Sequence, residues 1–357
     1  MSSELKKLFA ARKEKILKVL ENFLFDKNTR ELLDLPWNNE LPEILLEYTT
    51  RGKCLRGNLV LLGYVAAGGR LRKNAPCYQA AAAIELFQSG ILMHDDLIDD
   101  DNLRRGKPSC HKFFEEFLLQ KNFSHPEKNG RALALCLGDI ALMLTFSLLE
   151  ESKVNHKILR LVTSEWGSTF ASVGAAEMED SYLAETKEEI SLQRILNLYL
   201  NKTASYTFML PLITGALLKN AKQSFIAKLT TFSLHLGTLF QIKDDELGIF
   251  GSEKALGKPI GSDIRENKKT IFRELLFAAA TKSEKIKLEK IFGRENVSEK
   301  DVAFVRTLME NHGVTKKVQT LKTCFAKNAE AALENLTSPK IENIFRQLIA
   351  YSLERQN

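Results

Sequence analysis

The chain has 357 residues, 44% of them hydrophobic and 27% charged, which is the composition of an ordinary globular protein with a sizeable core. Its formal net charge is +6, and its lysines and arginines are spread along the chain instead of forming a tail. This balance suits an anionic small substrate or a membrane surface at least as well as a nucleic acid. Because the sequence has no zinc-finger, basic-zipper or aromatic RNA-binding signature, we do not expect it to bind nucleic acid.

The cysteine pattern and the N-terminal residues favour a cytoplasmic protein. The five cysteines are widely spaced and include no CxxC pair, which is typical of reduced thiols. Residues 1–25 have a charged amphipathic pattern and lack the apolar core of a signal peptide. The most membrane-like stretch is 132–149, but Gly138 and Asp139 interrupt it, so it falls short of the roughly 18–20 clean apolar residues of a span. We therefore predict a buried helix there and no transmembrane segment.

Apolar residues recur at helical spacing along most of the chain. Residues 5–24 and 318–336 are clear examples, whereas no stretch alternates for long enough to predict a β-strand. Polar segments near 121–130 and 251–270 predict loops, and the charged stretch 281–301 predicts solvated helices joined by a turn. The pattern therefore predicts an all-α protein with about a dozen or more helices.

A first acidic cluster follows an apolar helix. The segment HDDLIDDDNLRRGKP, residues 94–108, places five aspartates within seven residues and a basic cluster directly after them. Asp95 and Asp99 are four residues apart, so on a helix they lie on the same face and repel each other unless a cation binds between them. Oxygen ligands without histidine or cysteine favour Mg²⁺ over zinc. Acidic runs also commonly cap helices or face solvent, so this pattern alone is a weak signal for a metal.

The surroundings of this cluster strengthen the signal. Counting back from Asp95 along one helix face gives an apolar stripe of Ile91, Phe87 and Ile84. The basic side chains that follow the cluster suit phosphate binding; they are Arg104, Arg105 and Lys107. An apolar wall, carboxylates for a divalent metal and phosphate-binding side chains together predict a site for an amphiphile with a hydrocarbon tail and a diphosphate head.

A second acidic cluster, Asp244 and Asp245, ends another apolar helix. Four large side chains before it have the spacing of core residues, and ordinary packing explains them; they are Phe232, Leu236, Leu239 and Phe240. If the two acidic helix ends face each other across a central apolar cavity, they can hold one diphosphate through several metal ions. We therefore predict a single large helical bundle around that cavity, with residues 1–357 as one domain.

Fragments in register between about residues 50 and 275 resemble the trans-isoprenyl diphosphate synthases of the polyprenyl synthetase family. In chain order they are GKCLRG, ELFQSGILMHDDLIDDDNLRRGKP, LGDIAL, NKTAS, QIKDDELG and LGKPIGSDIRENKKT. Each fragment alone is common, but their shared order is specific to the family. The resemblance implies the all-helical isoprenoid synthase fold and a Mg²⁺-dependent prenyltransferase.

The resemblance also implies a role for each matching residue. Asp95 and Asp99, supported by Asp96, would ligate two Mg²⁺ ions, and Asp244 would ligate a third. The basic residues implied for the allylic diphosphate are Arg104, Lys202 and Lys258. Those implied for isopentenyl diphosphate are Lys53, Arg56 and Arg105, with the amide of Gln88 as a further donor.

Other matching residues line the reaction centre in the family. Thr203 and Gln241 match positions whose oxygens face the developing carbocation, so they join Lys202 and the aspartates as candidate catalytic residues. Lys268 would close over the site, although a solvated lysine is an equally good reading of that position. A further polar motif on the cavity wall resembles GAAEMED, which contains Glu177 and Asp180.

Three positions deserve separate comment. Gly248 stands where many members have the third aspartate of the second motif, and we expect activity to survive this change. Asn267 replaces a glycine that is common before Lys268, which would stiffen that loop. His94 precedes the aspartates as it does in many relatives, and we interpret it as structural.

The implied reaction joins two diphosphates. The C–O bond of an allylic diphosphate (dimethylallyl, geranyl or farnesyl) ionises, the double bond of isopentenyl diphosphate attacks the cation head to tail, and a proton and pyrophosphate are lost. Catalysis would rest mostly on electrostatic stabilisation of the leaving group in a water-poor cavity.

Product length depends on what blocks the apolar face below Asp95. Ile91 and Gly90 are the fourth and fifth residues before it, where farnesyl-producing relatives tend to have aromatic side chains. The next residue on that face is Phe87, which at about 1.5 Å per residue lies roughly 12 Å below the metals. We therefore predict geranylgeranyl diphosphate, a C20 product. A neighbouring helix or a partner subunit is an alternative source of the cavity floor.

Other readings of the motifs remain open. The product of the same reaction is alternatively farnesyl or a longer polyprenyl diphosphate. A class I terpene cyclase usually has an Asn/Ser/Glu metal triad in place of Asp244 and Asp245, and a non-catalytic partner subunit tends to lose one acidic motif. The resemblance also implies a homodimer, which is the commonest closed assembly.

Overall fold

The computed structural model of the protein describes residues 2–186, 188, 190–251 and 261–355. These residues are predominantly α-helical, which confirms the predicted fold class. They form two compact units. The N-terminal unit comprises residues 6–163 and 214–221, and the C-terminal unit comprises the described parts of 1–5, 164–213 and 222–357. That residues 1–357 form one domain around a central apolar cavity stays a prediction.

The described residues before position 156 form seven helices and a short β-hairpin. In chain order these elements are α1 (Ser3–Leu24), α2 (Lys27–Leu33), α3 (Leu41–Thr50), α4 (Leu55–Ala66), α5 (Cys77–Ile98), β1 (Leu103–Arg104), β2 (Lys107–Pro108), α6 (Cys110–Gln120) and α7 (Pro126–Glu150).

The second half is also mostly helical in its described residues. Its elements are α8 (His156–Glu185), α9 (Leu192–Tyr199), the π-helix η1 (Leu200–Met209), α10 (Leu210–Leu218), α11 (Gln223–Phe250), α13 (Ser262–Arg265), α14 (Ile271–Ala279), α15 (Lys282–Ile291), α16 (Glu299–Asn311), α17 (Val314–Ala332) and α18 (Pro339–Glu354). Three boundaries between the two units fall within α1, α8 and α10, and a fourth lies between α10 and α11.

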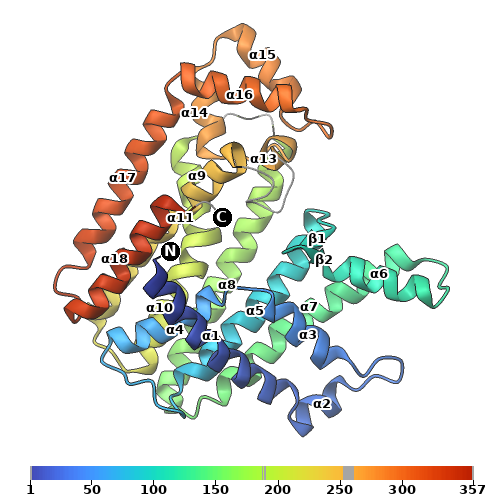
Figure 1. Ribbon diagram of the computed structural model, residues 1–357, viewed down its shortest axis with the longest axis vertical. Helices are drawn as coiled ribbons and strands as arrows, with labels where there is room; N and C mark the ends of the chain where they lie inside the picture. Colours follow the sequence, from blue (N-terminus) through green and yellow to red (C-terminus); the bar gives the residue numbers. More distant parts are fainter. Residues whose placement is uncertain (1, 187, 189, 252–260, 356–357) are drawn as a thin grey trace. The chain divides into compact units, whose positions relative to one another are not determined.

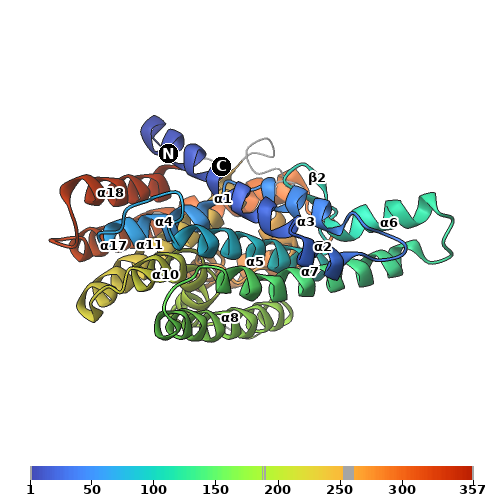
Figure 2. The same ribbon diagram turned by 90° about the horizontal axis from the view of Figure 1, so that it is seen from below.

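In the N-terminal unit, α5 packs along α7 and also contacts α4 (Figures 1 and 2). Residues 80–83 of α5 are alanines and are fully buried, which lets neighbouring helices approach closely. One close approach is at Gly90, where an added Cβ would lie 2.8 Å from the backbone oxygen of Gly138 on α7. The apolar face of α5 is therefore covered by neighbouring helices.

In the C-terminal unit, α11 packs against η1, α17 and α18, and α17 and α18 lie side by side (Figure 1). Gly237 of α11 touches Ala204 of η1 so closely that a Cβ at position 237 would overlap the Ala204 backbone. Helical periodicity predicted the helix over this region but not its π geometry. A π-helical segment is rare and is frequently found at a functional site.

Two sequence predictions about regular structure had different outcomes. The charged stretch 281–301 does form helices with a turn, since α15 and α16 flank residues 292–298. The expectation of no β-strands was wrong in one place, because β1 and β2 pair antiparallel with Arg104 opposite Lys107. Each strand has only two residues, which is too short for an alternating pattern to be recognised in the sequence.

Helix α7 contains the membrane-like stretch. It is long and apolar enough to cross a membrane, and 44% of its most apolar 18-residue window is buried within the structure. Leu135 and Met143 on this helix are exposed, so the prediction of a buried helix holds for one face only. Core helices of soluble proteins also meet this length and composition test, so α7 gives weak evidence for a membrane span.

Candidate active site

One arginine contacts three aspartates of the first acidic cluster. Asp95 and Asp96 lie in the last turn of α5, and Arg104 follows them on β1. The Arg104 guanidinium donates to Asp96 Oδ1 from Nε at 2.5 Å, to Asp95 Oδ2 at 3.2 Å and to Asp101 Oδ2 at 3.3 Å. Asp99 caps α5, and its backbone N–H donates to the backbone oxygen of Asp95 at 2.9 Å, so Asp95 and Asp99 lie one helical turn apart as predicted.

Burial and neighbouring charges have opposite effects on the pKa values in this cluster. Asp96 is fully buried, and this burial raises its pKa despite the nearby Arg104. Burial alone would lower the pKa of Arg104, but Asp96 and Asp95 outweigh it and raise that pKa. The guanidinium therefore stays charged and holds the carboxylates together. Asp95, whose side chain is 25% exposed, is the more accessible of the two aspartates.

The hairpin after α5 places a second arginine. Arg105 and Gly106 form its two-residue turn with φ values of 56° and 76°. Two left-handed residues are typical of the type I′ turns that connect strands most tightly, but a non-glycine residue such as Arg105 adopts this conformation at a cost. The Arg105 side chain lies against Gly52, where a Cβ would overlap it. Gly52 of the GKCLRG segment therefore leaves the space that the Arg105 side chain occupies.

A buried glutamate supports the residues predicted for isopentenyl diphosphate. Glu85 of α5 is 6% exposed, and its Oε1 accepts the N–H of Gly57 at 2.7 Å. Burial raises the pKa of Glu85, while this N–H and the charges of Arg56 and Arg105 act in the opposite direction. Arg56 and Arg105 therefore both interact electrostatically with one buried carboxylate. The sequence analysis missed Glu85, although a lone carboxylate in an apolar helix was a usable signal.

The other residues of this predicted group lie nearby. Gln88 is buried on α5, three residues after Glu85, and Lys53 is exposed just before α4. The loop that carries Lys53 is held by Lys13 of α1, whose Nζ donates to the backbone oxygens of Thr50 at 2.9 Å and Gly52 at 2.7 Å. Lys13 is a second residue that sequence reasoning missed, because nothing local links α1 to this loop.

In the C-terminal unit, Lys202 lies between two carboxylates. Its Nζ donates to Asp180 Oδ2 at 2.5 Å and to Glu177 Oε2 at 2.9 Å. Burial alone would lower the pKa of Lys202, but these two carboxylates outweigh it and raise that pKa. The GAAEMED motif and the lysine of NKTAS are therefore brought together, and Lys202 keeps its charge.

A chain of hydrogen bonds joins η1 to the second acidic cluster. Thr203 Oγ1 donates to Gln241 Oε1 at 2.6 Å, and Gln241 Nε2 donates to Asp245 Oδ1 at 2.8 Å. Tyr199 Oη donates to the other oxygen of Asp245. Complete burial raises the pKa of Asp245 well above its ordinary value. Thr203 and Gln241, both predicted from sequence, therefore orient each other.

Asp244 is bound by an arginine from the far end of the chain. Arg355, at the C-terminal end of α18, donates to Asp244 Oδ1 at 2.5 Å and to the Phe240 oxygen at 3.3 Å. Its guanidinium also lies 3.7 Å from the centre of the Phe240 ring, as a cation–π contact. The Asp244 side chain is 54% exposed, so it can still meet a ligand.

The segment after α11 contains the remaining predicted residues. Lys258 lies outside the described residues. Lys268 Nζ pairs with Glu266 Oε2 at 2.7 Å. Asn267 has a φ of 51°, which explains why glycine suits this position, and its Nδ2 donates to the Ala184 oxygen at 2.7 Å. Asn267 thus adopts the left-handed conformation and ties the loop to α8, in keeping with the predicted stiffening.

The residues predicted to set product length occupy different surroundings. Phe87 is 4% exposed, and Ile91 is partly exposed. Gly90 faces α7, with the Gly138 oxygen and the side chain of Leu142 against it. This contact gives Gly90 a packing role, and its effect on product length stays a prediction. His94 packs against Gly138, and its Nε2 lies 3.1 Å from the Leu135 oxygen, which agrees with a structural role.

The carboxylates suit magnesium bound together with a diphosphate. Within the described ranges, no group of three or more His, Cys, Asp or Glu side chains is placed to hold a metal alone. Mg²⁺ typically takes one or two protein carboxylates and completes its shell with water and phosphate oxygens. Asp95 and Asp244 are accessible oxygen donors, and each already binds a cationic guanidinium. They belong to different units, so their convergence on one diphosphate stays a prediction.

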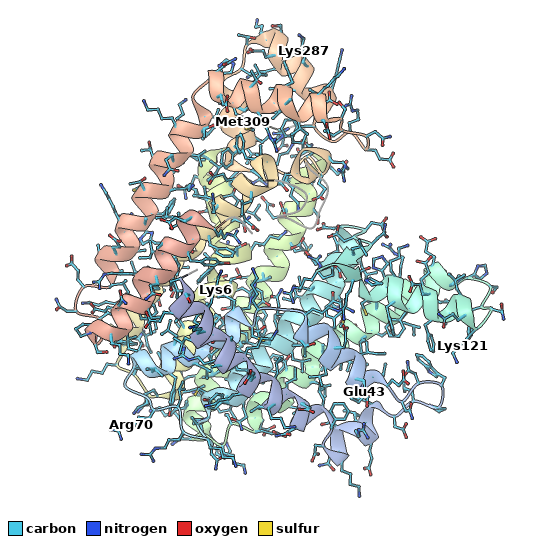
Figure 3. The ribbon with its side chains drawn as sticks, in the orientation of Figure 1. Lys6, Glu43, Arg70, Lys121, Lys287 and Met309 are labelled. Carbon is cyan, nitrogen blue, oxygen red and sulfur yellow. The ribbon has the colours of Figure 1, made fainter. Side chains whose placement is uncertain are left out.

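A cleft of about 370 Å³ lies elsewhere in the N-terminal unit. It is lined by residues of α3, β2 and α6, among them Glu43, which Figure 3 labels. Glu47 in this cleft pairs with both Arg51 at 2.7 Å and Lys107 at 2.5 Å, so its charge is matched. Lys107, one of the basic residues predicted to suit phosphate binding, lines this cleft, whereas the predicted metal ligands and the other predicted substrate-binding residues do not.

Comparison with known proteins decides the family. The sequence model of the polyprenyl synthetase family matches residues 38–309. The geranylgeranyl diphosphate synthase of Saccharolobus solfataricus is 31% identical over 298 residues, which cover 83% of this chain and 82% of that protein. The farnesyl diphosphate synthase of Bacillus subtilis is 33% identical over 279 residues, covering 76% of this chain and 84% of that protein.

The chain belongs to the polyprenyl synthetase family. The crystal structure of a Corynebacterium glutamicum geranylgeranyl pyrophosphate synthase, complexed with isoprenyl diphosphate and magnesium, resembles it with a TM-score of 0.88. That likeness covers 98% of this chain and 99% of the other, at 26% identity. The family resemblance inferred from short fragments is therefore confirmed, and the matched range contains every residue predicted for the site.

Proposed function

We propose that this polyprenyl synthetase is a Mg²⁺-dependent trans-prenyltransferase. It joins an allylic diphosphate to isopentenyl diphosphate head to tail and releases pyrophosphate. The observation that carries this function is the family match over residues 38–309, which includes both aspartate-rich helix ends. Relatives named geranylgeranyl and farnesyl diphosphate synthases support the same reaction.

Bound magnesium would be held by Asp95, Asp99 and Asp244, and it would supply charge neutralisation of the departing diphosphate. The chain's own cations share this task. Arg104 and Lys202 would donate to the allylic diphosphate, and both carry raised pKa values that keep them protonated. A family complex with magnesium supports this metal, and we propose three ions per active site.

Other side chains would bind the second substrate and face the cation. Glu85 interacts electrostatically with both Arg56 and Arg105, which reduces the repulsion between the two arginines, and they would bind the diphosphate of isopentenyl diphosphate. The hydroxyl oxygen of Thr203 and the amide oxygen of Gln241 lie 2.6 Å apart and would direct their dipoles at the allylic cation. Lys53, Gln88, Lys258 and Lys268 complete the proposed phosphate-binding set.

The decisive test is condensation by the purified single chain with Mg²⁺. Asp95→Asn, Asp99→Asn and Asp244→Asn should each lower kcat/KM by about a hundredfold or more, because each loses a charged ligand for the metal and diphosphate. Asp100→Asn is the matched control, since its exposed carboxylate pairs with Arg131 and not with Arg104. An inactive wild-type chain would show a non-catalytic subunit, and a hydrocarbon product would show a cyclase.

We propose geranylgeranyl diphosphate as the product, which agrees with the name of the Saccharolobus relative. The farnesyl synthase relative makes farnesyl diphosphate the second candidate. Incubation with farnesyl diphosphate and labelled isopentenyl diphosphate should give a C20 product, and Phe87→Ala should lengthen it.

Leu86→Ala is the control for that experiment, because Leu86 is also fully buried but is the adjacent residue of α5 and so points to another face. Both variants should lose about 2–5 kcal/mol of stability. A longer product from Phe87→Ala alone would therefore separate the effect on product length from the effect on packing. Unchanged products from Phe87→Ala would show that another element forms the floor of the cavity.

We also propose a homodimer, to be tested by sedimentation equilibrium.

A further inference from the structure

Two buried tyrosines bind equivalent carboxylates in the two aspartate-rich motifs. Tyr48 of α3 donates from Oη to Asp96 Oδ2 at 2.7 Å. Tyr199, the last residue of α9, donates from Oη to Asp245 Oδ2. Asp96 and Asp245 are each the second aspartate of their motif. The same arrangement therefore occurs independently in the N-terminal and the C-terminal unit.

In both units the second carboxylate oxygen holds a residue of the proposed active site. Asp96 Oδ1 accepts Nε of Arg104 at 2.5 Å. Asp245 Oδ1 accepts Nε2 of Gln241 at 2.8 Å, and the opposite end of that amide accepts the hydroxyl of Thr203. Each aspartate is thus a bridge between a tyrosine on one side and a substrate-facing side chain on the other.

Burial makes these bridges rigid. Asp96 is 0% exposed and Asp245 is 5% exposed, while Tyr48 and Tyr199 are 3% and 5% exposed. Water cannot replace a lost hydrogen bond there without a rearrangement, and an unsatisfied buried carboxylate oxygen is costly. The first aspartates, Asp95 and Asp244, are more exposed, so the two positions of each motif divide into a ligand position and a bridging position.

The hydroxyl of Tyr199 makes a second hydrogen bond besides the one to Asp245. Its oxygen accepts the backbone N–H of Ile271 at 3.0 Å, at the start of α14. With that lone pair occupied, the hydroxyl hydrogen is directed at Asp245. The segment before α14 contains Lys268, so this tyrosine also connects the bridge to the loop that follows the second motif.

We propose that Tyr48 and Tyr199 are positioning residues for the prenyl transfer reaction. Tyr48 holds Asp96 so that Arg104 is oriented toward the allylic diphosphate, and Tyr199 holds Asp245 so that Gln241 and Thr203 are oriented toward the cation. Neither tyrosine touches substrate. The inference rests on the proposed function, because it assigns these roles within that reaction.

Removal of each hydroxyl tests the two bridges separately. Tyr48→Phe should raise KM for the allylic diphosphate about tenfold with kcat changed by less than about threefold, since it disturbs a binding arginine. It should also weaken Mg²⁺-dependent binding of inorganic pyrophosphate, measured by calorimetry without turnover, by about the same factor. Tyr199→Phe should instead lower kcat about tenfold and leave pyrophosphate binding within about twofold of wild type.

Tyr78→Phe is the matched control. Tyr78 is 4% exposed on α5, and no hydrogen bond from its hydroxyl is found among the described residues. It should keep wild-type kinetics and pyrophosphate binding. If Tyr78→Phe reproduced either loss, the effect would be general core packing and the proposal would be wrong.

A double-mutant cycle distinguishes a bridge from a separate effect. Tyr48→Phe combined with Asp96→Asn should lose much less than the product of the two single effects, whereas Tyr48→Phe with Asp245→Asn should lose about the full product. Wild-type kinetics and binding in both tyrosine variants, or independent effects within the Tyr48–Asp96 pair, would overturn the inference. An active wild-type chain in the same assays would leave the proposed function standing.

Discussion

Asp263 lies where the third aspartate of the second motif would need space. A Cβ added at Gly248 would overlap the Asp263 carboxylate. Asp263 also contributes to the raised pKa of Asp245, so negative charge is already concentrated beside position 248. The glycine that departs from the common family pattern is therefore matched by a carboxylate from α13, which supplies negative charge at the same place.

Restoring the family residue should consequently be harmful. Gly248→Asp is expected to lower both the unfolding free energy and kcat/KM, because it adds a like charge against Asp263. Gly248→Ala is the control for size alone, and its smaller methyl group needs only a shift of the flexible Asp263 side chain. Urea unfolding and steady-state kinetics would check this. Equal or better activity in Gly248→Asp than in Gly248→Ala would contradict the charge argument.

At the scale of elements, glycines determine how closely α5 and α7 pack. Gly138 of the LGDIAL fragment accommodates the His94 ring, and an added Cβ would also lie 3.2 Å from the Gly90 oxygen. The end of α5 that carries the first aspartates is thereby fixed by a contact one helical turn before it. The fragments of this unit that resemble the family thus form packing contacts besides containing the proposed ligands.

Gly138→Ala should destabilise the protein by about 1–3 kcal/mol, because it overfills a tight helix contact. Gly167→Ala on α8 is the matched substitution, since a Cβ there meets nothing within 4 Å. That variant should gain up to about 1 kcal/mol from the higher helix propensity of alanine. Urea denaturation of the two variants measures the difference. Similar stabilities would show that α5 and α7 separate at little cost.

At the scale of the whole molecule, the proposed reaction would require residues of both units to act on one substrate. The proposed ligands Asp95 and Asp244 belong to different units. Groups that act together on one transition state are strongly non-additive when they are removed.

Asp95→Asn and Asp244→Asn should therefore be non-additive. The double variant should be no more than about tenfold slower than the slower single variant. Asp100→Asn with Asp244→Asn is the control pair, and it should behave like Asp244→Asn alone. Single-turnover rates at saturating Mg²⁺ would measure these effects. Fully multiplicative losses in the Asp95 and Asp244 pair would indicate that the two motifs act in separate steps.

The sequence by itself determined the helical fold class, the family and the candidate ligands. Helical periodicity and charge clusters are local properties, so residues 94–108 and the Asp244–Asp245 pair could be recognised without coordinates. The two-residue strands and the π geometry of η1 were not predicted, because neither leaves a periodic pattern long enough to detect.

Only the tertiary structure decided which groups neutralise and orient those ligands. Tyr48 contacts Asp96, and Arg355 contacts Asp244, across 48 and 111 positions of sequence. Glu85 of α5 likewise interacts electrostatically with Arg56 and Arg105, which lie outside that helix. Such contacts depend on how helices pack, and packing brings together residues whose separation along the chain carries no information about their partners.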